Sequence, residues 1–293
     1  MFRFDFEEPV NREIRRLVLD ELKDAIDALR DADTPLAARI HEARKHLKRL
    51  RAVLALVSDC ADPALIEQLA SSCRSAAAAL ATPRGHAALL ACFDELVKSA
   101  NDATHAELRS ELEARANRVT IEVGDSLEAA AERLREARQQ AKALELDENG
   151  FAAIGEGFRA TYRSARRALR RAGSHGNVEA FHAFRKPSKR HAYQLRLFEA
   201  AWDAQLGAHT GELELLGELL GEHHDLCLLQ GEVANMSLKE PPNAMIAAAE
   251  RRVRELERMV LSLGTRCFAE RPGAITRRIG VYFNQARRER RNG

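Results

Sequence analysis

The sequence predicts an all-α protein built from two related helical halves. Ala, Leu, Glu and Arg dominate the composition and are strong helix formers, whereas proline occurs only 8 times in 293 residues. Apolar residues recur at steps of three and four through most of the chain, which is the period of an amphipathic helix. Long alternating runs of β-branched and aromatic residues are missing, so we expect no sheet.

Short turn signals divide this helical pattern into segments. Clusters of Pro, Gly, Asp or Asn predict breaks at 31–35, 59–63, 82–85, 173–177 and 271–273. The joint between the halves is expected at 147–150, which predicts an N-terminal bundle over 1–148 and a C-terminal bundle over 149–293. Connections this short make neighbouring helices antiparallel, as is typical of helical bundles.

A cation-rich segment of the chain occurs twice. Residues 40–49 match residues 181–190 at an offset of 141, and five polar positions coincide. The matched pairs are His41 and His182, Arg44 and Arg185, Lys45 and Lys186, Lys48 and Lys189, and Arg49 and Arg190. This repeat predicts an internal duplication in which a basic helix is the second helix of each half.

The first copy has a cationic face beside its core face. Its apolar residues are Ile40, Ala43, Leu47, Leu50, Leu54 and Val57, which form one stripe on a helix. His41, Arg44, Lys45, Lys48 and Arg51 follow the same spacing on the flank of that stripe. We therefore expect these cations to line a groove. Like charges three or four residues apart weaken a helix by a few tenths of a kcal/mol per pair, and a bound polyanion would remove that cost.

The second copy repeats this cationic face. It consists of His182, Arg185, Lys186 and Lys189, followed by Tyr193, and no acidic residue occurs between Ala180 and Phe198. The preceding helix adds further cations, among them Arg163 and Arg166. Two basic helices with matched faces indicate a polyanion site more specifically than one basic run does, because a single run is usually just a solvated face.

A third segment, Leu219–Leu229, contains His223, His224 and Asp225. We expect a helix to end at Gly221 and the next to begin at Glu222. Asp225 would then act as a structural organiser that favours the helix dipole or pairs with a cation of the basic face. The three side chains also have metal-ligand chemistry. Adjacent helical residues point about 100° apart, however, so we expect no metal ion here.

The cysteine content and the lack of long apolar runs indicate the cellular compartment. Cys60, Cys73, Cys92, Cys227 and Cys267 are odd in number, and no CxxC pair occurs, which favours reduced thiols in a cytoplasmic protein. The N-terminal residues lack the apolar stretch of a signal peptide, and no run of 18 apolar residues occurs. We therefore expect no membrane partner.

The chain resembles the CHAD family, the histidine α-helical domain. The resemblance rests on the two His-x-x-Arg-Lys-x-x-Lys-Arg segments, on Gly157–Leu169 and on Leu220–Leu226, and it spans residues 10–288. It implies two antiparallel four-helix bundles related by internal pseudo-twofold symmetry. It also implies binding of inorganic polyphosphate on the basic surface between the bundles, and association with a triphosphate-processing enzyme.

Matching the family motif residue by residue names the polyphosphate-binding side chains. They would be His41, Arg44, Lys45, Lys48, His182, Arg185, Lys186 and Lys189, assisted by Arg163 and Arg166. The chain also departs from the family pattern. Pro187 lies inside the second basic helix and should kink it, Ser188 and His191 replace core residues, and Gly85 stands at the counterpart of Asp225.

Polyphosphate suits this composition better than nucleic acid does. It has no bases to stack, and only 5% of the residues are aromatic, whereas single-strand binders interleave aromatics with cations. No exposed element for reading a duplex is evident, so we expect no sequence-specific nucleic acid. We expect a binding protein without cofactor or catalysis. Two alternatives stay open: a metal-dependent phosphohydrolase using His223, His224 and Asp225 with His182, and a helical scaffold for an acidic partner, such as a polyphosphate granule protein.

Overall fold

The all-α fold is confirmed in the computed structural model, which describes residues 2–97, 103–121, 124–236 and 242–292. These residues contain helices and no strand. The helices are α1 (Val10–Arg30), α2 (Leu36–Leu54), α3 (Pro63–Ala79), α4 (Ala81–Leu96), α5 (Ala103–Ile121), α6 (Gly124–Gln140), α7 (Ala152–His175), α8 (Val178–Phe198), α9 (Asp203–Ala234), α10 (Asn243–Cys267) and α11 (Pro272–Asn292). Two short 3-10 helices, η1 (Ala141–Ala143) and η2 (Glu199–Ala201), follow α6 and α8.

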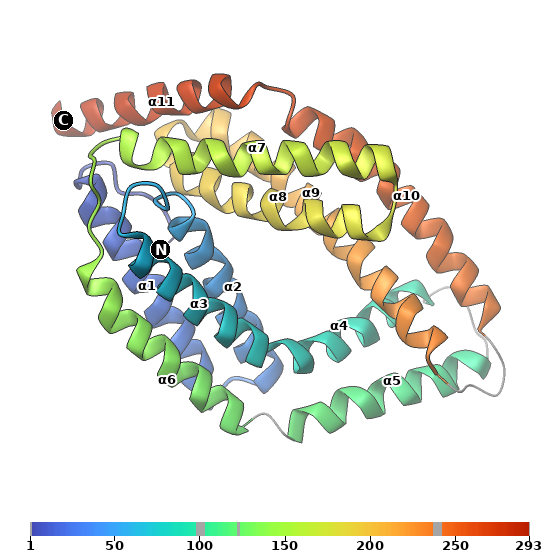
Figure 1. The fold of residues 1–293 in the computed structure, drawn as a ribbon. Coiled ribbons are helices and arrows are strands. Elements are labelled where there is room, and N and C mark those ends of the chain that lie inside the picture. The colour runs from blue at the N-terminus through green and yellow to red at the C-terminus, as the bar shows by residue number, and fades with distance from the viewer. Residues whose placement is uncertain (1, 98–102, 122–123, 237–241, 293) are drawn as a thin grey trace.

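The helices pack in two groups (Figure 1). In the first half α1 packs on α2 and α6, and α3 packs on α2 and α6. In the second half α7, α8, α9 and α10 follow one another around a bundle, with α11 along α7. The pair α4 and α5 extends from the first half until α4 contacts α9. The predicted joint falls between η1 and α7. The pseudo-twofold relation and the division into two domains stay predictions.

Four of the five predicted breaks, at 31–35, 59–63, 173–177 and 271–273, fall at helix ends, and two of these ends have a side-chain cap. The Asp62 carboxylate accepts a hydrogen bond from the Ala64 amide at 2.9 Å, and Pro63 is the first residue of α3. The Asn177 side chain accepts one from the Ala180 amide at 3.0 Å at the start of α8. Gly176, just before it, has a φ of 62°, a left-handed conformation that ends α7.

One predicted break is displaced and one predicted helix end is wrong. The boundary expected at 82–85 falls at Leu80, between α3 and α4, so Pro83 lies in the first turn of α4, where a missing N–H breaks no helical hydrogen bond. Gly221 lies in the middle of α9, which is one helix of 32 residues. A glycine lowers helix propensity by about 1 kcal/mol, which packing against neighbouring helices overrides. The prediction that Gly85 is the counterpart of Asp225 concerns a position whose surroundings the structure does not describe.

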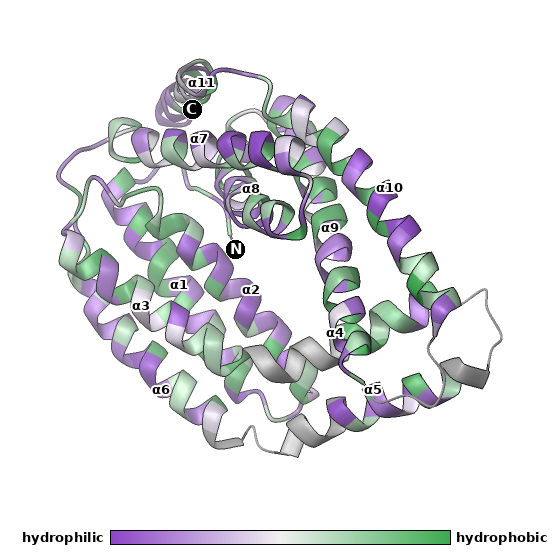
Figure 2. Cartoon of the chain, turned by 45° about the vertical axis from the view of Figure 1, so that its right-hand side comes forward, coloured by the Kyte–Doolittle hydropathy of each residue, from purple (hydrophilic) through white to green (hydrophobic). Residues whose placement is uncertain are grey.

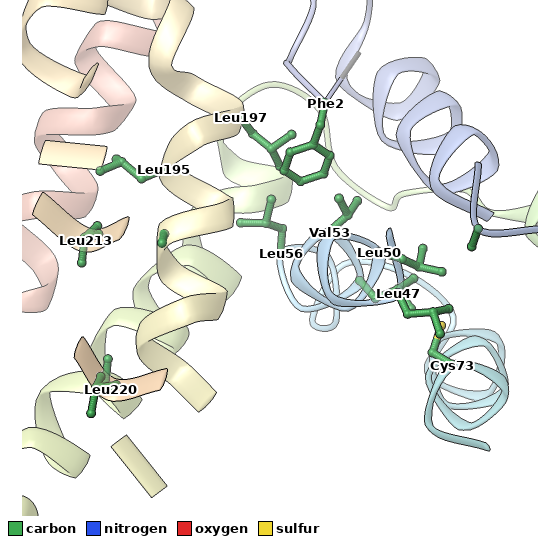
Figure 3. Packing of buried hydrophobic residues seen from close by; sticks show 14 of the residues in the cluster. Phe2, Leu47, Leu50, Val53, Leu56, Cys73, Leu195, Leu197, Leu213 and Leu220 are labelled. Atoms are coloured by element: carbon green, nitrogen blue, oxygen red, sulfur yellow. The ribbon is translucent and has the colours of Figure 1, made fainter. Parts of the chain in front are cut away.

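The hydrophobic core is continuous across the two halves. Hydrophobic and hydrophilic residues alternate along each helix (Figure 2), and the predicted core stripe of α2 is buried as expected. Figure 3 shows Phe2 of the N-terminal segment between Leu56, which follows α2, and Leu197 of α8. The Phe4 amide donates to the Leu197 carbonyl at 3.0 Å. The N-terminal segment therefore helps to join the two halves.

One side-chain hydrogen bond and one close backbone approach also join the halves. The Gln194 side chain of α8 donates from Nε2 to the Ala52 carbonyl of α2 at 3.1 Å, and within the second half it lies 3.2 Å from the Thr161 hydroxyl of α7. A Cβ added to Gly157 of α7 would overlap the backbone that follows α2 at Ala55 and Leu56. The hydrogen bond therefore ties α8 to α2, and the glycine lets α7 approach the end of α2.

The remaining expectations concern the cysteines and the membrane. All five cysteines lie in the described ranges and are free thiols, without a disulfide. Within the part of the chain that the structure describes, no helix combines the length and the apolar character needed to cross a bilayer.

Candidate polyanion site

The two copies of the basic segment lie on α2 and α8, which pack against each other. Cations from both helices line one pocket of about 300 Å³, and residues of α9 line it as well. Its lining residues include Lys45, Arg49, Lys189, Tyr193, Arg196 and Glu214. The pocket also contains Glu218, and Arg196 is paired with Glu214 at 2.6 Å. The fold thus brings together cations that lie more than 140 positions apart in the chain.

Two arginines approach each other across the α2–α8 contact. Burial lowers the pKa of the Arg190 guanidinium, and the charge of Arg51 lowers it further. A shift of this kind indicates a cation that has lost water and gained a like charge. Arg49 lies with its guanidinium 5.1 Å from the centre of the Phe2 ring, and its buried Nε has no hydrogen-bond partner among the described residues. This contact therefore stabilises Arg49 through its cation–π geometry.

Glycines of α9 make room for cations of α8. A Cβ added to Gly217 would lie 3.0 Å from Cε of Lys189, tighter than ordinary van der Waals contact. One turn further on, a Cβ on Gly221 would lie 3.7 Å from a terminal nitrogen of Arg185. The Lys189 and Arg185 side chains therefore extend across the surface of α9. Gly221 lies where Arg185 crosses the helix and does not mark a helix end.

His182 and His224 contact each other one turn before Arg185 on α8. The Nδ1 atoms of His182 on α8 and His224 on α9 lie 3.2 Å apart. Burial lowers the pKa of His182, and the charges of Lys186 and Arg185 lower it further. Burial also lowers the pKa of His224 to about 4, and neighbouring His182 and Arg185 add to that shift. Both rings are therefore neutral near pH 7, poised beside cations.

The α2 residues of the predicted site have more varied surroundings. His41 is exposed, whereas Arg44, Lys48 and Arg51 are half-buried. Arg44 donates to the Ala77 carbonyl of α3 at 2.7 Å, so part of its guanidinium anchors α2 to α3. Lys45 pairs with Glu42 at 2.8 Å, one turn earlier on the same helix. A ligand would compete with that half-exposed pair, which is a weak one.

Arg163 and Arg166 are not brought to the α2–α8 pocket. Arg163 pairs with Glu156 at 3.3 Å on the same helix, α7. Arg166 donates to the Glu270 carbonyl at 2.6 Å, between α10 and α11. Their described contacts thus lie along α7 and at the α10–α11 turn. Arg166 fastens that turn to the bundle.

The His223–Asp225 segment does not form one cluster. His223 is buried, its ring packs on Phe181, and its Nε2 lies 3.4 Å from a Glu257 carboxylate oxygen. The charge of Asp225 acts on Cys92 of α4: burial raises the pKa of that thiol to about 12, and Asp225 raises it further. Together with the His182–His224 contact, these neighbours place the three side chains in different surroundings.

The departures in α8 are accommodated in the core. α8 continues through Pro187 as one helix, and Pro187 is buried. Ser188 and His191 are fully buried, as their core positions predict. The His191 ring lies 4.9 Å from the Phe158 ring and 5.1 Å from the Tyr162 ring. Burial lowers its pKa to about 3, so His191 acts as a neutral core residue.

Two cations that line the pocket, Arg49 and Arg196, are not among the predicted binding side chains. Neither are Arg190, which lies near Arg51, and His224, which contacts His182. Arg49 and Arg190 did coincide in the repeat, so the repeat itself was the available signal. His224 lies 42 positions from His182, and no spacing rule connects residues so far apart on two helices.

Known proteins resemble the chain in sequence and in fold. The family model of the CHAD domain matches residues 13–234. PptA from Streptomyces chartreusis superimposes with a TM-score of 0.61 and 14% identity, over 89% of this chain and 98% of that one. A crystal structure of the CHAD domain from the plant Ricinus communis gives a TM-score of 0.60 and 18% identity, over 91% and 94% of the two chains. None of the curated proteins matches this sequence.

Proposed function

Because this chain belongs to the CHAD domain family, we propose that it binds inorganic polyphosphate on the cations that α2 and α8 present together. One observation carries the proposal: both copies of the repeated basic segment supply cations to the same pocket, Lys45 and Arg49 from α2 and Lys189 from α8. A receptor built from two helices offers charge along a line, which suits a linear polyanion. Lys supplies point charges and Arg forked donors, and both suit phosphate oxygens.

The repulsion within the site supports an anionic ligand. Burial lowers the pKa of Arg190, and the charge of Arg51 across the α2–α8 contact lowers it further. A phosphate chain between the helices would supply the opposite charge and relieve that repulsion. Aromatic side chains are sparse at the pocket, where Tyr193 is the aromatic residue among its lining. This favours a polyanion without bases over single-stranded nucleic acid.

We infer binding without catalysis. A phosphohydrolase built on His223, His224 and Asp225 needs these groups to converge on one ion or one phosphate. His223 lies beside Glu257, and His224 lies beside His182. Their separate surroundings favour structural and binding roles. The proposal leaves room for an acidic protein partner, such as a granule protein or a triphosphate-processing enzyme, that competes for the same cations.

Titration of the purified protein with long-chain polyphosphate, pyrophosphate and duplex DNA at one salt concentration tests the proposal. Long-chain polyphosphate is expected to bind most tightly, because a polymer contacts the cations of the pocket and the further cations along α2 and α8 at the same time. Affinity should fall steeply with salt, since each neutralised phosphate releases counterions. Equal affinity for DNA, or a salt-independent affinity, would rule the proposal out. Release of orthophosphate during the titration would instead indicate the hydrolase.

Polyphosphate affinity is expected to rise as pH falls from about 8 to about 5.5, around the ordinary histidine pKa near 6.5. In the free protein burial lowers the pKa of His182 and of His224. A bound polyanion raises both values, so binding takes up protons. The added affinity is largest at acidic pH and disappears as pH rises through the bound-state pKa. It stops growing once pH falls below the free-state value, about 4 for His224.

A double variant measures the histidine contribution. His182→Gln with His224→Gln should leave affinity at about pH 8 unchanged and remove most of the gain near pH 5.5, because glutamine cannot take up the proton. His41→Gln measures how much the exposed His41 contributes to the gain in polyphosphate affinity at low pH. His175→Gln, on an exposed histidine at the end of α7, is the matched control and should keep the full gain. An equal loss at both pH values would show that the pair acts only by orienting the helices.

A further inference from the structure

A second group of ligand-forming side chains lies between α1 and α2, apart from the pocket. Glu21 and Asp24 are one turn apart on α1, and His46 faces them from α2. One ligand atom from each of the three lies within 4.8 Å of the others. The Nδ1 atom of His46 is 2.7 Å from a Glu21 carboxylate oxygen and 3.9 Å from an Asp24 oxygen.

His46 is the basic side chain that contacts the buried Glu21 carboxylate. Glu21 is 3% exposed, so its carboxylate is almost wholly removed from water. A buried carboxylate is costly unless a cation or strong donors compensate it. The neighbouring cations are used elsewhere: Lys23 pairs with Asp27 at 2.7 Å, and Nε of Arg138 donates to the Leu19 carbonyl. Two carboxylates and one imidazole therefore face one another between α1 and α2.

We propose that Glu21, Asp24 and His46 bind a divalent transition-metal ion of the zinc class. Imidazole and carboxylate are the mixed ligand set that zinc accepts, whereas magnesium and calcium prefer oxygen alone. Zinc–ligand bonds of about 2.0–2.1 Å in a tetrahedron separate neighbouring ligand atoms by about 3.3 Å. The separations of 2.7 Å and 3.9 Å lie on either side of that value, so small side-chain rotations suffice. Water would complete the coordination.

Such an ion would cross-link α1 to α2. His46 lies between Lys45 and Lys48 on the helix that carries the first copy of the basic segment. The ion would therefore stabilise the packing of that helix in the first half of the chain. The proposal does not depend on polyphosphate, because the two sites use different side chains.

Cobalt(II) added to the metal-free protein tests the proposal directly. Visible d–d absorption of low-symmetry coordination is expected at one equivalent, and zinc should displace it. Zinc should also raise the temperature of unfolding, because an ion that binds only the folded state stabilises it by mass action. Asp24→Asn, at the half-exposed ligand, and His46→Gln are each expected to weaken metal binding on the order of 100-fold. Asp24→Asn avoids disturbing buried Glu21, and helical circular dichroism checks that each variant is folded.

His224→Gln is the matched control, because it removes one histidine of the His182–His224 pair, the other place where a histidine nitrogen lies close to a potential metal ligand. It should retain both the cobalt absorption and the zinc-dependent rise in unfolding temperature. Loss of both signals in His224→Gln, with retention in His46→Gln, would place the ion at His182 and His224 and overturn the proposal. Absence of cobalt absorption in the unaltered protein would overturn it as well.

Discussion

Exchanging Lys45 and Lys189 together for glutamine is expected to weaken long-chain polyphosphate binding on the order of 100-fold at low salt, since each charge-assisted contact contributes about 1.5 kcal/mol or more. The two lysines come from different helices and line one pocket. Their loss should also flatten the slope of log affinity against log salt by about 1.4, at about 0.7 for each contact to a single-stranded polyanion. Affinity measured across a salt series gives both quantities. Lys45→Ala with Lys48→Ala, both on α2, should change the slope similarly.

A control variant that loses the same charge far from the pocket distinguishes binding at the α2–α8 pocket from attraction by the overall charge of the protein. Arg133 of α6 and Lys142 of η1 are exposed, and α6 packs on α1 and α3. Replacing both with glutamine removes the same formal charge and should change polyphosphate affinity less than threefold, by weakening long-range attraction alone. If the two double variants lose affinity equally, the chain attracts polyanions by overall charge and the α2–α8 pocket has no special role.

Gly157→Ala is expected to destabilise the protein by about 3 kcal/mol or more, because the new methyl group would overlap backbone and not a movable side chain. Backbone at Ala55 and Leu56 cannot rotate away as a flexible side chain can. The unfolding temperature should fall by roughly 6–12 °C for a chain of this size. Thermal and denaturant unfolding followed by circular dichroism measure the change.

Gly173→Ala is the control within the same helix. A Cβ there would lie 3.7 Å from Cδ2 of Leu261, which is ordinary van der Waals contact. Alanine should therefore stabilise α7 by about 0.5–1 kcal/mol through its higher helix propensity. If Gly157→Ala leaves stability unchanged or raises it as Gly173→Ala should, α7 does not approach the end of α2 as closely as the structure has it.

The helices and the core of α2 could be predicted because they depend on local information. Apolar residues at steps of three and four define a buried stripe whatever the stripe packs against, so Leu47 and Leu50 were identified as core residues. The repeat likewise placed the basic segments on the second helix of each half. The capped starts at Pro63 and Val178 were visible because Asp, Asn and Pro act on their nearest neighbours.

The helix end at Gly221 was wrong, and several side-chain contacts could not be predicted, because residues far apart in the chain determine them. Gly221 has the residue type of a helix end, yet it lies where Arg185 crosses α9, which only the packing of α8 reveals. Arg166 belongs to a basic face by spacing, but a carbonyl more than a hundred positions away binds it. The convergence of Glu21 and Asp24 with His46 depends on the rotation of α1 against α2, which periodicity alone leaves open.

The hydrogen bond from Gln194 to the Ala52 carbonyl has a consequence for folding during synthesis, because the two halves can join only after α8 has been made. Its partners are 142 positions apart, so the contact cannot form until the second half has been made. At about 5–20 residues per second, the ribosome needs on the order of 10 s to cover that distance. During this interval the apolar residues that α8 adds to the shared core, such as Leu195 and Leu197, are missing from it. A nascent chain of this protein is therefore expected to be a chaperone client until α8 emerges, whereas the finished chain is not.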